Sequence, residues 1–132
     1  MLIKKVRYEL TQPIITSKAQ IESRDGWVVA LGEGEYTGCG EILPLEGWSS
    51  VTMEEAYSQL ISYKHSETSL PELSNEVQAA ISLAIWNLEA SKNGESLVEH
   101  LGGGADCVKV NALLDGSSPV SYTHLRAHET AV

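Results

Sequence analysis

Residues 38–52, GCGEILPLEGWSSVT, decide the fold expected of this chain. The stretch opens inside a strand that begins at Tyr36, and Pro44 ends the strand because proline has no N–H for a sheet ladder. Thr52 and Glu55 then form a T-x-x-E capping box. The stretch therefore predicts a strand, a connecting loop and the start of a helix.

The loop between that strand and that helix, residues 45–49, carries a large aromatic residue beside a glycine. A tryptophan on a solvent-facing loop marks a contact surface more often than it marks packing. Trp48 is therefore a candidate contact residue. The alternative is that its ring folds back as a lid over a small domain.

The residues before this stretch predict an antiparallel meander. Apolar and polar side chains alternate in the first strand, and Pro13 is expected to lie beyond its end. Residues 14–25 are polar without a clear period, which predicts a flexible loop. Gly34 begins a short turn, and short connections favour antiparallel pairing. The strands are expected at residues 3–10, 26–32 and 36–42.

The residues after residue 51 are mostly helical in pattern. The strongest helix repeats apolar residues at i, i+3, i+4 and i+7, and Gly94 suits its left-handed C-terminal end. Ser96 is the expected cap of a short helix that follows. The helices are expected at residues 52–63, 75–92 and 97–101. The fold class is therefore α+β, a three-stranded antiparallel meander followed by a helical bundle.

The chain divides into three parts by composition. Residues 1–104 form the α+β domain, and residues 105–119 contain a lone apolar strand at 107–113 that resembles the opening of a further domain. Residues 120–130, VSYTHLRAHET, are what translation of a transposase-type sequencing adapter gives. We therefore interpret residues 120–132 as a disordered, adapter-derived tail, outside the natural fold. The i, i+4 histidine pair in that tail is then no metal site.

Composition limits the classes of partner. The net charge is -9 and the isoelectric point is near 4.8, which argues against nucleic acid and against anionic membrane surfaces. No apolar run approaches the roughly 20 residues of a membrane span. Cys39 and Cys107 lack metal-type spacing and are expected to be buried thiols of a cytoplasmic protein. A disulfide between them is the less favoured alternative.

No catalytic set emerges from the residues themselves. The glycines between residues 32 and 38 lie on a hairpin without a following helix, so they do not predict a phosphate loop. Glu41 is a solvated residue, a structural partner or a site acid, and the structural role is favoured. His65 and His100 stand alone in the sequence. We expect no catalytic residue and no metal ligand in this chain.

The chain resembles the N-terminal capping domain of the enolase superfamily, and most closely that of the o-succinylbenzoate synthases. Four segments carry the resemblance, which extends from residue 3 to about residue 116. They are GCGEILPLEGWSSVT with the preceding PIITSKAQIESRDGWVVAL, the helix EVQAAISLAIWNL at residues 76–88, LGG at 101–103 and VKVNALL at 108–114.

The resemblance implies a Mg²⁺-dependent lyase. In that family a lysine of a (β/α) barrel removes a proton next to the carboxylate of a small-molecule substrate, and Mg²⁺ stabilises the enediolate. Those groups lie at the ends of barrel strands. By this resemblance the catalytic groups and metal ligands would follow residue 119, in a barrel domain that is the expected partner of this chain. The chain alone is therefore expected to be inactive.

What carries over to this chain is a specificity lid of two loops, at about residues 15–24 and 45–49, that close over the barrel mouth. Two alternatives remain open. The barrel could be that of a dipeptide epimerase or a muconate-type cycloisomerase, or the chain could be a stand-alone α+β binding module. The expected substrate-contacting residues are Thr16, Ser17, Lys18, Leu45, Gly47, Trp48 and Ser49.

Overall fold

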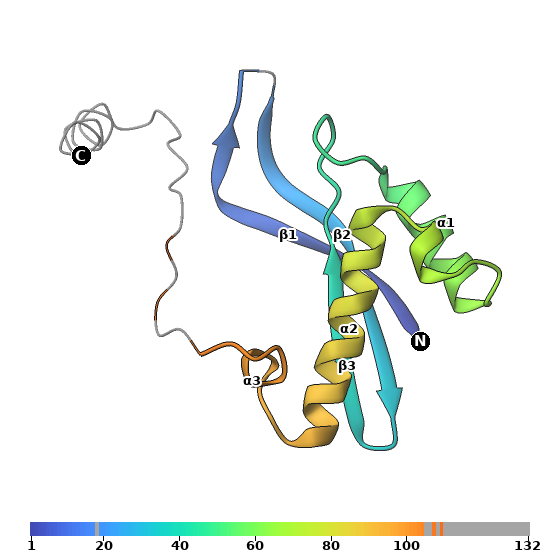
Figure 1. The fold of residues 1–132 in the computed structure, drawn as a ribbon. Coiled ribbons are helices and arrows are strands. Elements are labelled where there is room, and N and C mark those ends of the chain that lie inside the picture. The colour runs from blue at the N-terminus through green and yellow to red at the C-terminus, as the bar shows by residue number, and fades with distance from the viewer. Residues whose placement is uncertain (18, 105–106, 108, 110–132) are drawn as a thin grey trace. The chain divides into compact units, whose positions relative to one another are not determined.

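The computed structural model describes residues 1–17, 19–104, 107 and 109. Three strands form one sheet in the order β1-β2-β3, and helices follow (Figure 1). This arrangement confirms the predicted α+β class and the antiparallel meander. The elements in chain order are β1 (Leu2–Ile15), β2 (Gln20–Glu33), β3 (Tyr36–Ile42), α1 (Met53–Lys64), the 3₁₀ helix η1 (Leu70–Glu72), α2 (Asn75–Asn93) and α3 (Leu97–His100).

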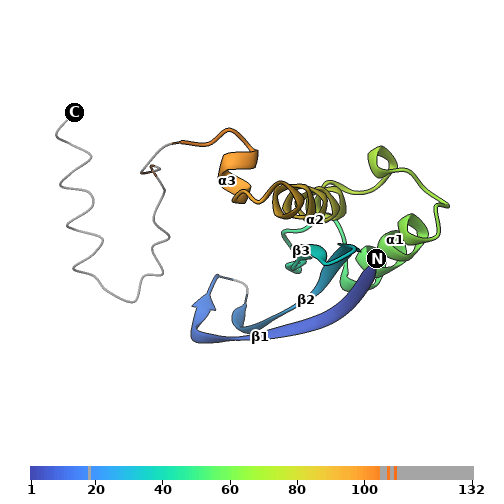
Figure 2. The same cartoon turned by 90° about the horizontal axis from the view of Figure 1, so that it is seen from below.

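The chain separates into two compact units, and each is described by itself. The first contains residues 1–9 and 23–104, and the second contains residues 10–22 and 105–132. All of the helices and the whole of β3 belong to the first unit. Within it the helices lie on one face of the sheet (Figure 2).

The prediction of a flexible loop at residues 14–25 is wrong. Strand β1 continues to Ile15 and β2 begins at Gln20, so most of that polar stretch is strand. Pro13 does not end β1, because β1 is an edge strand and a proline is tolerated where no ladder N–H is needed. Backbone pairing across a hairpin therefore overrides the weak side-chain pattern.

Helix α2 lies directly against β3 because two glycines of the strand have no side chain. A Cβ at Gly40 would overlap the carbonyl group of Ala80. A Cβ at Gly38 would overlap backbone atoms of Ala84 and Leu88. Backbone therefore packs on backbone, an approach that any larger residue at these positions would prevent.

An apolar core lies between the sheet and helices α1 and α2. Trp27 of β2 orients α1, because its indole donates to the carbonyl oxygen of Met53 at 2.9 Å and its ring stacks on Tyr57 with centroids 4.6 Å apart. Burying this apolar surface is the main stabilising contribution. The core residues are Val29, Ile42, Val51, Ala56, Leu60, Leu73, Val77, Ala80, Ile81 and Ala84.

The prediction that Cys39 is buried is wrong. Alternate residues of β3 face opposite sides of the sheet, so Gly38 and Gly40 face the helix whereas the Cys39 thiol is exposed. The backbone carbonyl of Cys39 accepts a hydrogen bond from Asn87 of α2 at 2.9 Å. In the described sheet β3 is an edge strand. The Asn87 side chain therefore satisfies a carbonyl oxygen that has no neighbouring strand to pair with. Cys107 is also exposed, and both thiols are free.

The predicted helix ends are confirmed to within about a residue. Thr52 caps α1 in a full capping box with Glu55, and Ser96 caps α3 in the same way. Gly94 adopts the left-handed conformation, with φ of 69°, at the end of α2. Among the described residues, no helix has the length and apolar character needed to cross a membrane.

The predicted strand at residues 107–113 and the predicted tail at residues 120–132 fall almost wholly outside the described residues. Both stay predictions.

Replacing Gly40 by alanine is expected to destabilise the domain by about 1–3 kcal/mol, because the added methyl forces α2 away from β3. Gly32→Ala is the matched control, since a Cβ there would meet only the carbonyl oxygen of Tyr36 at 3.8 Å. Urea unfolding followed by circular dichroism measures both variants. Equal unfolding midpoints would contradict the backbone-contact explanation.

Candidate functional site

The loop of residues 45–49 is the most prominent exposed feature between β3 and α1. Trp48 is 78% exposed, so its ring does not fold back over the domain, and the alternative reading is wrong. Gly47 and Glu46 are also exposed, whereas Leu45 and Ser49 are half-buried. The loop therefore presents one large apolar side chain on a short polar support.

Hydrogen bonds within the loop define its conformation. The amides of Trp48 and Ser49 both donate to the carbonyl oxygen of Leu45, at 3.0 and 2.8 Å. The Ser49 hydroxyl accepts a hydrogen bond from the Leu45 amide at 2.9 Å. Gly47 has φ of 81°, a left-handed conformation that a residue with a side chain rarely adopts. The indole is thus carried by a compact turn.

Two charged side chains hold the ends of this loop. Arg24 of β2 donates to the carbonyl oxygen of Leu43 just before the loop. After the loop, the amide and the hydroxyl of Ser50 each donate to a carboxylate oxygen of Glu76 at 2.7 Å. Both partners sit on regular elements of the first unit, so the loop is anchored at its two ends.

The Ser50 contacts also set the charge state of Glu76. Hydrogen bonds from the Ser50 side chain, and then from its backbone, hold the pKa of the Glu76 carboxyl below its usual range. Glu76 lies in the first turn of α2, where the helix dipole also favours a carboxylate. The sequence offered little sign of this anchor, because Ser50 and Glu76 are far apart in the chain.

The other predicted lid segment, residues 15–24, covers the tip of the β1–β2 hairpin, in the second unit, and continues into β2, where residues 23 and 24 belong to the first unit. Thr16 closes the tip: its amide and hydroxyl donate to the carbonyl oxygen of Ala19 at 2.9 and 3.0 Å, and its hydroxyl accepts from the Ala19 amide at 3.0 Å. Ser17 is exposed, and Lys18 lies outside the described residues. The predicted loop is therefore a short turn rather than a long flexible segment.

The chemistry available in the described part of the chain is limited. Over residues 1–17, 19–104, 107 and 109, no group of three or more His, Cys, Asp or Glu side chains is arranged to hold a metal ion. Glu41 accepts a hydrogen bond from the hydroxyl of Tyr8, which raises the pKa of the Tyr8 hydroxyl and agrees with the favoured structural role of Glu41.

Comparison with known proteins identifies the family. Residues 3–89 match the model of the MenC N-terminal domain. The chain belongs to this family. Its fold is accordingly that of an N-terminal capping domain of the enolase superfamily.

Curated relatives of this MenC N-terminal domain are o-succinylbenzoate synthases. The chain is 35% identical over 79 residues to the enzyme of Escherichia coli O9:H4 (strain HS), an alignment that covers 57% of this chain and 24% of that enzyme. It is 44% identical over 50 residues to the enzyme of Shigella boydii serotype 18, covering 38% and 16% of the two chains. The aligned region thus spans about a quarter or less of these relatives.

Solved structures share the fold of this domain. A probable mandelate racemase from Alicyclobacillus acidocaldarius superposes with a TM-score of 0.71 at 22% identity, over 97% of this chain and 40% of that one. An enolase-family member from Agrobacterium tumefaciens, with homology to dipeptide epimerases, has a TM-score of 0.62 at 20% identity, over 79% and 34%. Identities this low show the fold alone.

Replacing Glu76 by alanine is expected to release the C-terminal end of the loop, because the Ser50 amide and hydroxyl lose both acceptors. Amide hydrogen exchange should then show a loss of protection at Ser50. Glu54→Ala is the matched control, since Glu54 is an acidic residue in the first turn of α1. Unchanged exchange at Ser50 in Glu76→Ala would contradict the anchor.

The same anchor is expected to depend on pH in the unsubstituted chain. Because the folded pKa of Glu76 is lowered, its stabilising contribution is complete above the ordinary carboxyl value and is lost as the pH falls through the lowered value. Protection of the Ser50 amide, corrected for intrinsic exchange, should fall on acidification. Glu76→Ala should show a flat profile.

Proposed function

We propose that this chain is the N-terminal capping domain of an o-succinylbenzoate synthase. That enzyme removes water from 2-succinyl-6-hydroxy-2,4-cyclohexadiene-1-carboxylate to form o-succinylbenzoate, in menaquinone biosynthesis. The proposal is supported by the family match over residues 3–89 and by 35% identity to such a synthase over 79 residues. The whole activity belongs to a longer protein of which this chain is a part.

The proposed contribution of this domain is a lid that covers the substrate. The observation that carries it is an indole that is 78% exposed on a loop anchored at both ends. An exposed tryptophan held in this way is suited to become one wall of a closed site, where it excludes water and restricts substrate shape. The proposed lid residues are Thr16, Ser17, Lys18, Leu45, Gly47, Trp48 and Ser49.

We assign the chemical step to the remainder of the longer protein. Among the described residues, no group of three or more His, Cys, Asp or Glu side chains is arranged to hold Mg²⁺. The Mg²⁺ ligands, the base and the acid are proposed to reside in a barrel domain that follows. A carboxylate substrate would then be held between that barrel and the lid.

A cytoplasmic location is part of the proposal. Cys39 and Cys107 are both exposed and free, which suits a compartment that keeps thiols reduced.

The second candidate function is a dipeptide epimerase, and it is favoured by two structural relatives of this fold. One has homology to dipeptide epimerases and the other is an L-Ala-D/L-Glu epimerase, with TM-scores of 0.62 and 0.59. A muconate-type cycloisomerase would use the same kind of capping domain. Assay of the longer protein on the three substrate classes separates these activities.

The first experiment is to determine the natural coding sequence from genomic DNA. It should continue past residue 119 into a barrel domain, and the segment at residues 120–132 should be absent from it. A stop codon close to residue 119 would sink the enzyme proposal and favour a stand-alone binding module.

In the longer protein, Trp48→Ala is expected to lower kcat/KM for the dehydration by roughly 10–100-fold, because an open lid leaves the substrate poorly positioned. Tyr36→Ala is the matched control, since Tyr36 is an exposed aromatic residue at the start of β3. Steady-state kinetics measures both. If the two substitutions have equal effects, Trp48 does not serve as a lid residue.

The 132-residue chain alone is expected to show no dehydratase turnover and only weak Mg²⁺ binding. Calorimetric titration with Mg²⁺ and a product assay at high protein concentration measure these properties. Measurable turnover by the purified chain would overturn the assignment of the chemistry to another domain.

A further inference from the structure

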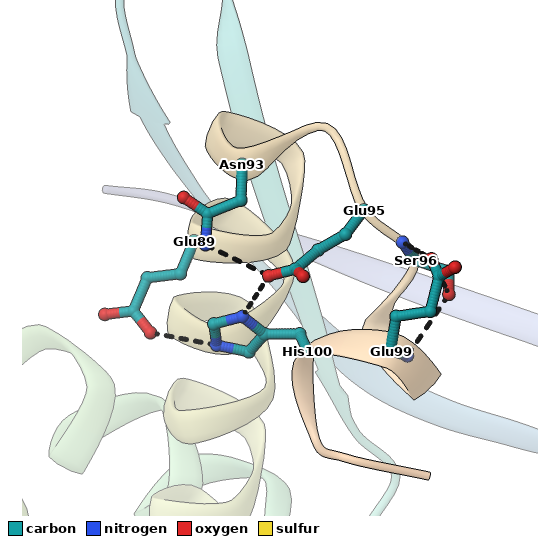
Figure 3. A network of polar contacts seen from close by, with 6 residues as sticks. All are labelled: Glu89, Asn93, Glu95, Ser96, Glu99 and His100. Atoms are coloured by element: carbon teal, nitrogen blue, oxygen red, sulfur yellow. Dashed lines mark hydrogen bonds and ion pairs between the residues drawn. The ribbon is translucent and has the colours of Figure 1, made fainter. Parts of the chain in front are cut away.

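A histidine held by two carboxylates joins the last two helices of the domain. His100 ends α3, and its ring lies between Glu95, in the connection before α3, and Glu89 on α2 (Figure 3). The Nδ1 atom is 2.8 Å from an oxygen of Glu95, and the Nε2 atom is 3.2 Å from an oxygen of Glu89. The histidine side chain is only 18% exposed. His100 is therefore not the isolated histidine that its sequence context suggested.

This geometry favours one protonation state of His100. A neutral imidazole has one N–H, so one of its two nitrogens would face a carboxylate oxygen with a lone pair. Two ionised carboxylate partners are satisfied together when both nitrogens carry hydrogen. The arrangement therefore favours the imidazolium ion.

The surrounding charges leave this pairing intact. Lys92 of α2 is directed elsewhere, with its ammonium 2.8 Å from both carboxylate oxygens of Glu33. Glu99 of α3 accepts hydrogen bonds from the amide and hydroxyl of Ser96. On the side of α2 and of the connection, the ionisable groups facing the His100 ring are thus Glu89 and Glu95.

We propose that Glu89, His100 and Glu95 form a proton-dependent clasp that holds α3 on the C-terminal end of α2. Helix α3 has only four residues, which is too short for a helix to be stable by itself in water. Val98 of α3 and Leu101 just after it are largely exposed, and Leu97 is half-buried, so the apolar packing of α3 is limited to Leu97. The clasp is accordingly a main connection of α3 to the domain, and α3 leads directly into the glycines at residues 102–104.

The direction of the pH dependence follows from the partners. The hydrogen bond with Glu95, helped by Glu89, raises the pKa of His100, while Asn93 and His100 lower the pKa of Glu95. The contribution of His100 is complete below its ordinary value and is lost as the pH rises through the raised value. The contribution of Glu95 is lost only as the pH falls through its lowered value. The clasp is therefore closed at pH values between the lowered pKa of Glu95 and the raised pKa of His100. Starting from neutral pH, it opens when the pH is raised, because His100 then loses its proton.

Amide hydrogen exchange of the full chain tests the clasp. The amides of His100, Leu101 and Gly103 donate to carbonyl oxygens of Ser96, Leu97 and Val98, so they report on α3 and its end. Corrected for intrinsic exchange, their protection should fall roughly two- to fivefold from about pH 6 to about pH 8.5. A fall of this size corresponds to losing the stabilisation that a surface ion pair typically gives. Constant protection in the unsubstituted chain over that range would overturn the proposal.

Variants separate the clasp from general pH effects. His100→Gln should remove the pH dependence, and Glu89→Gln should reduce it. His65→Gln, at the C-terminal end of α1, is the matched control and should keep the full dependence. In the unsubstituted chain, nitrogen chemical shifts of His100 should show both ring nitrogens protonated at about pH 6. A dependence that persists in His100→Gln, or a neutral ring at that pH, would refute the clasp.

Discussion

The structure depends on the contact between the backbone of β3 and the backbone of α2. Gly38 and Gly40 permit it, since a side chain at either position would occupy the space of the helix. At this distance the helix also places Asn87 on the carbonyl oxygen of Cys39 at 2.9 Å. The same approach brings Ala80 and Ala84 into the core. The distance between β3 and α2 is set by backbone atoms and tolerates little adjustment. Backbone atoms cannot move aside by a change of rotamer as a side chain can.

The exposed loop takes its position from this contact. Its N-terminal end continues from β3 and its C-terminal end is held by Glu76, in the first turn of α2. The close packing of β3 and α2 therefore fixes the distance between the two ends of the loop. The loop can then hold Trp48 in place although the side chain is 78% exposed. The loop of residues 45–49 is thus joined to the two elements that pack backbone to backbone.

The fold could be predicted to a large extent because its strongest signals are local. The capping box of Thr52 and Glu55, the apolar repeat of α2 and the left-handed Gly94 each act within a few residues. Where the local pattern is weak the prediction failed, as at residues 14–25, most of which lie in β1 and β2 despite their polar composition. The candidate site was predicted only in outline. The loop that carries Trp48 was predicted, but exposure of the ring and packing back of the ring were both left open, and its anchors Arg24 and Glu76 come from distant segments.

The sequence by itself determined the class of fold, the family and the position of the loop that carries Trp48, because capping residues, periodicity and loop composition act over short distances. The tertiary structure alone decided why two glycines are needed in β3, which carboxylate holds Ser50, and that His100 lies between Glu89 and Glu95. These features join residues that are far apart in the chain or on different elements. Their geometry exists only in the packed structure.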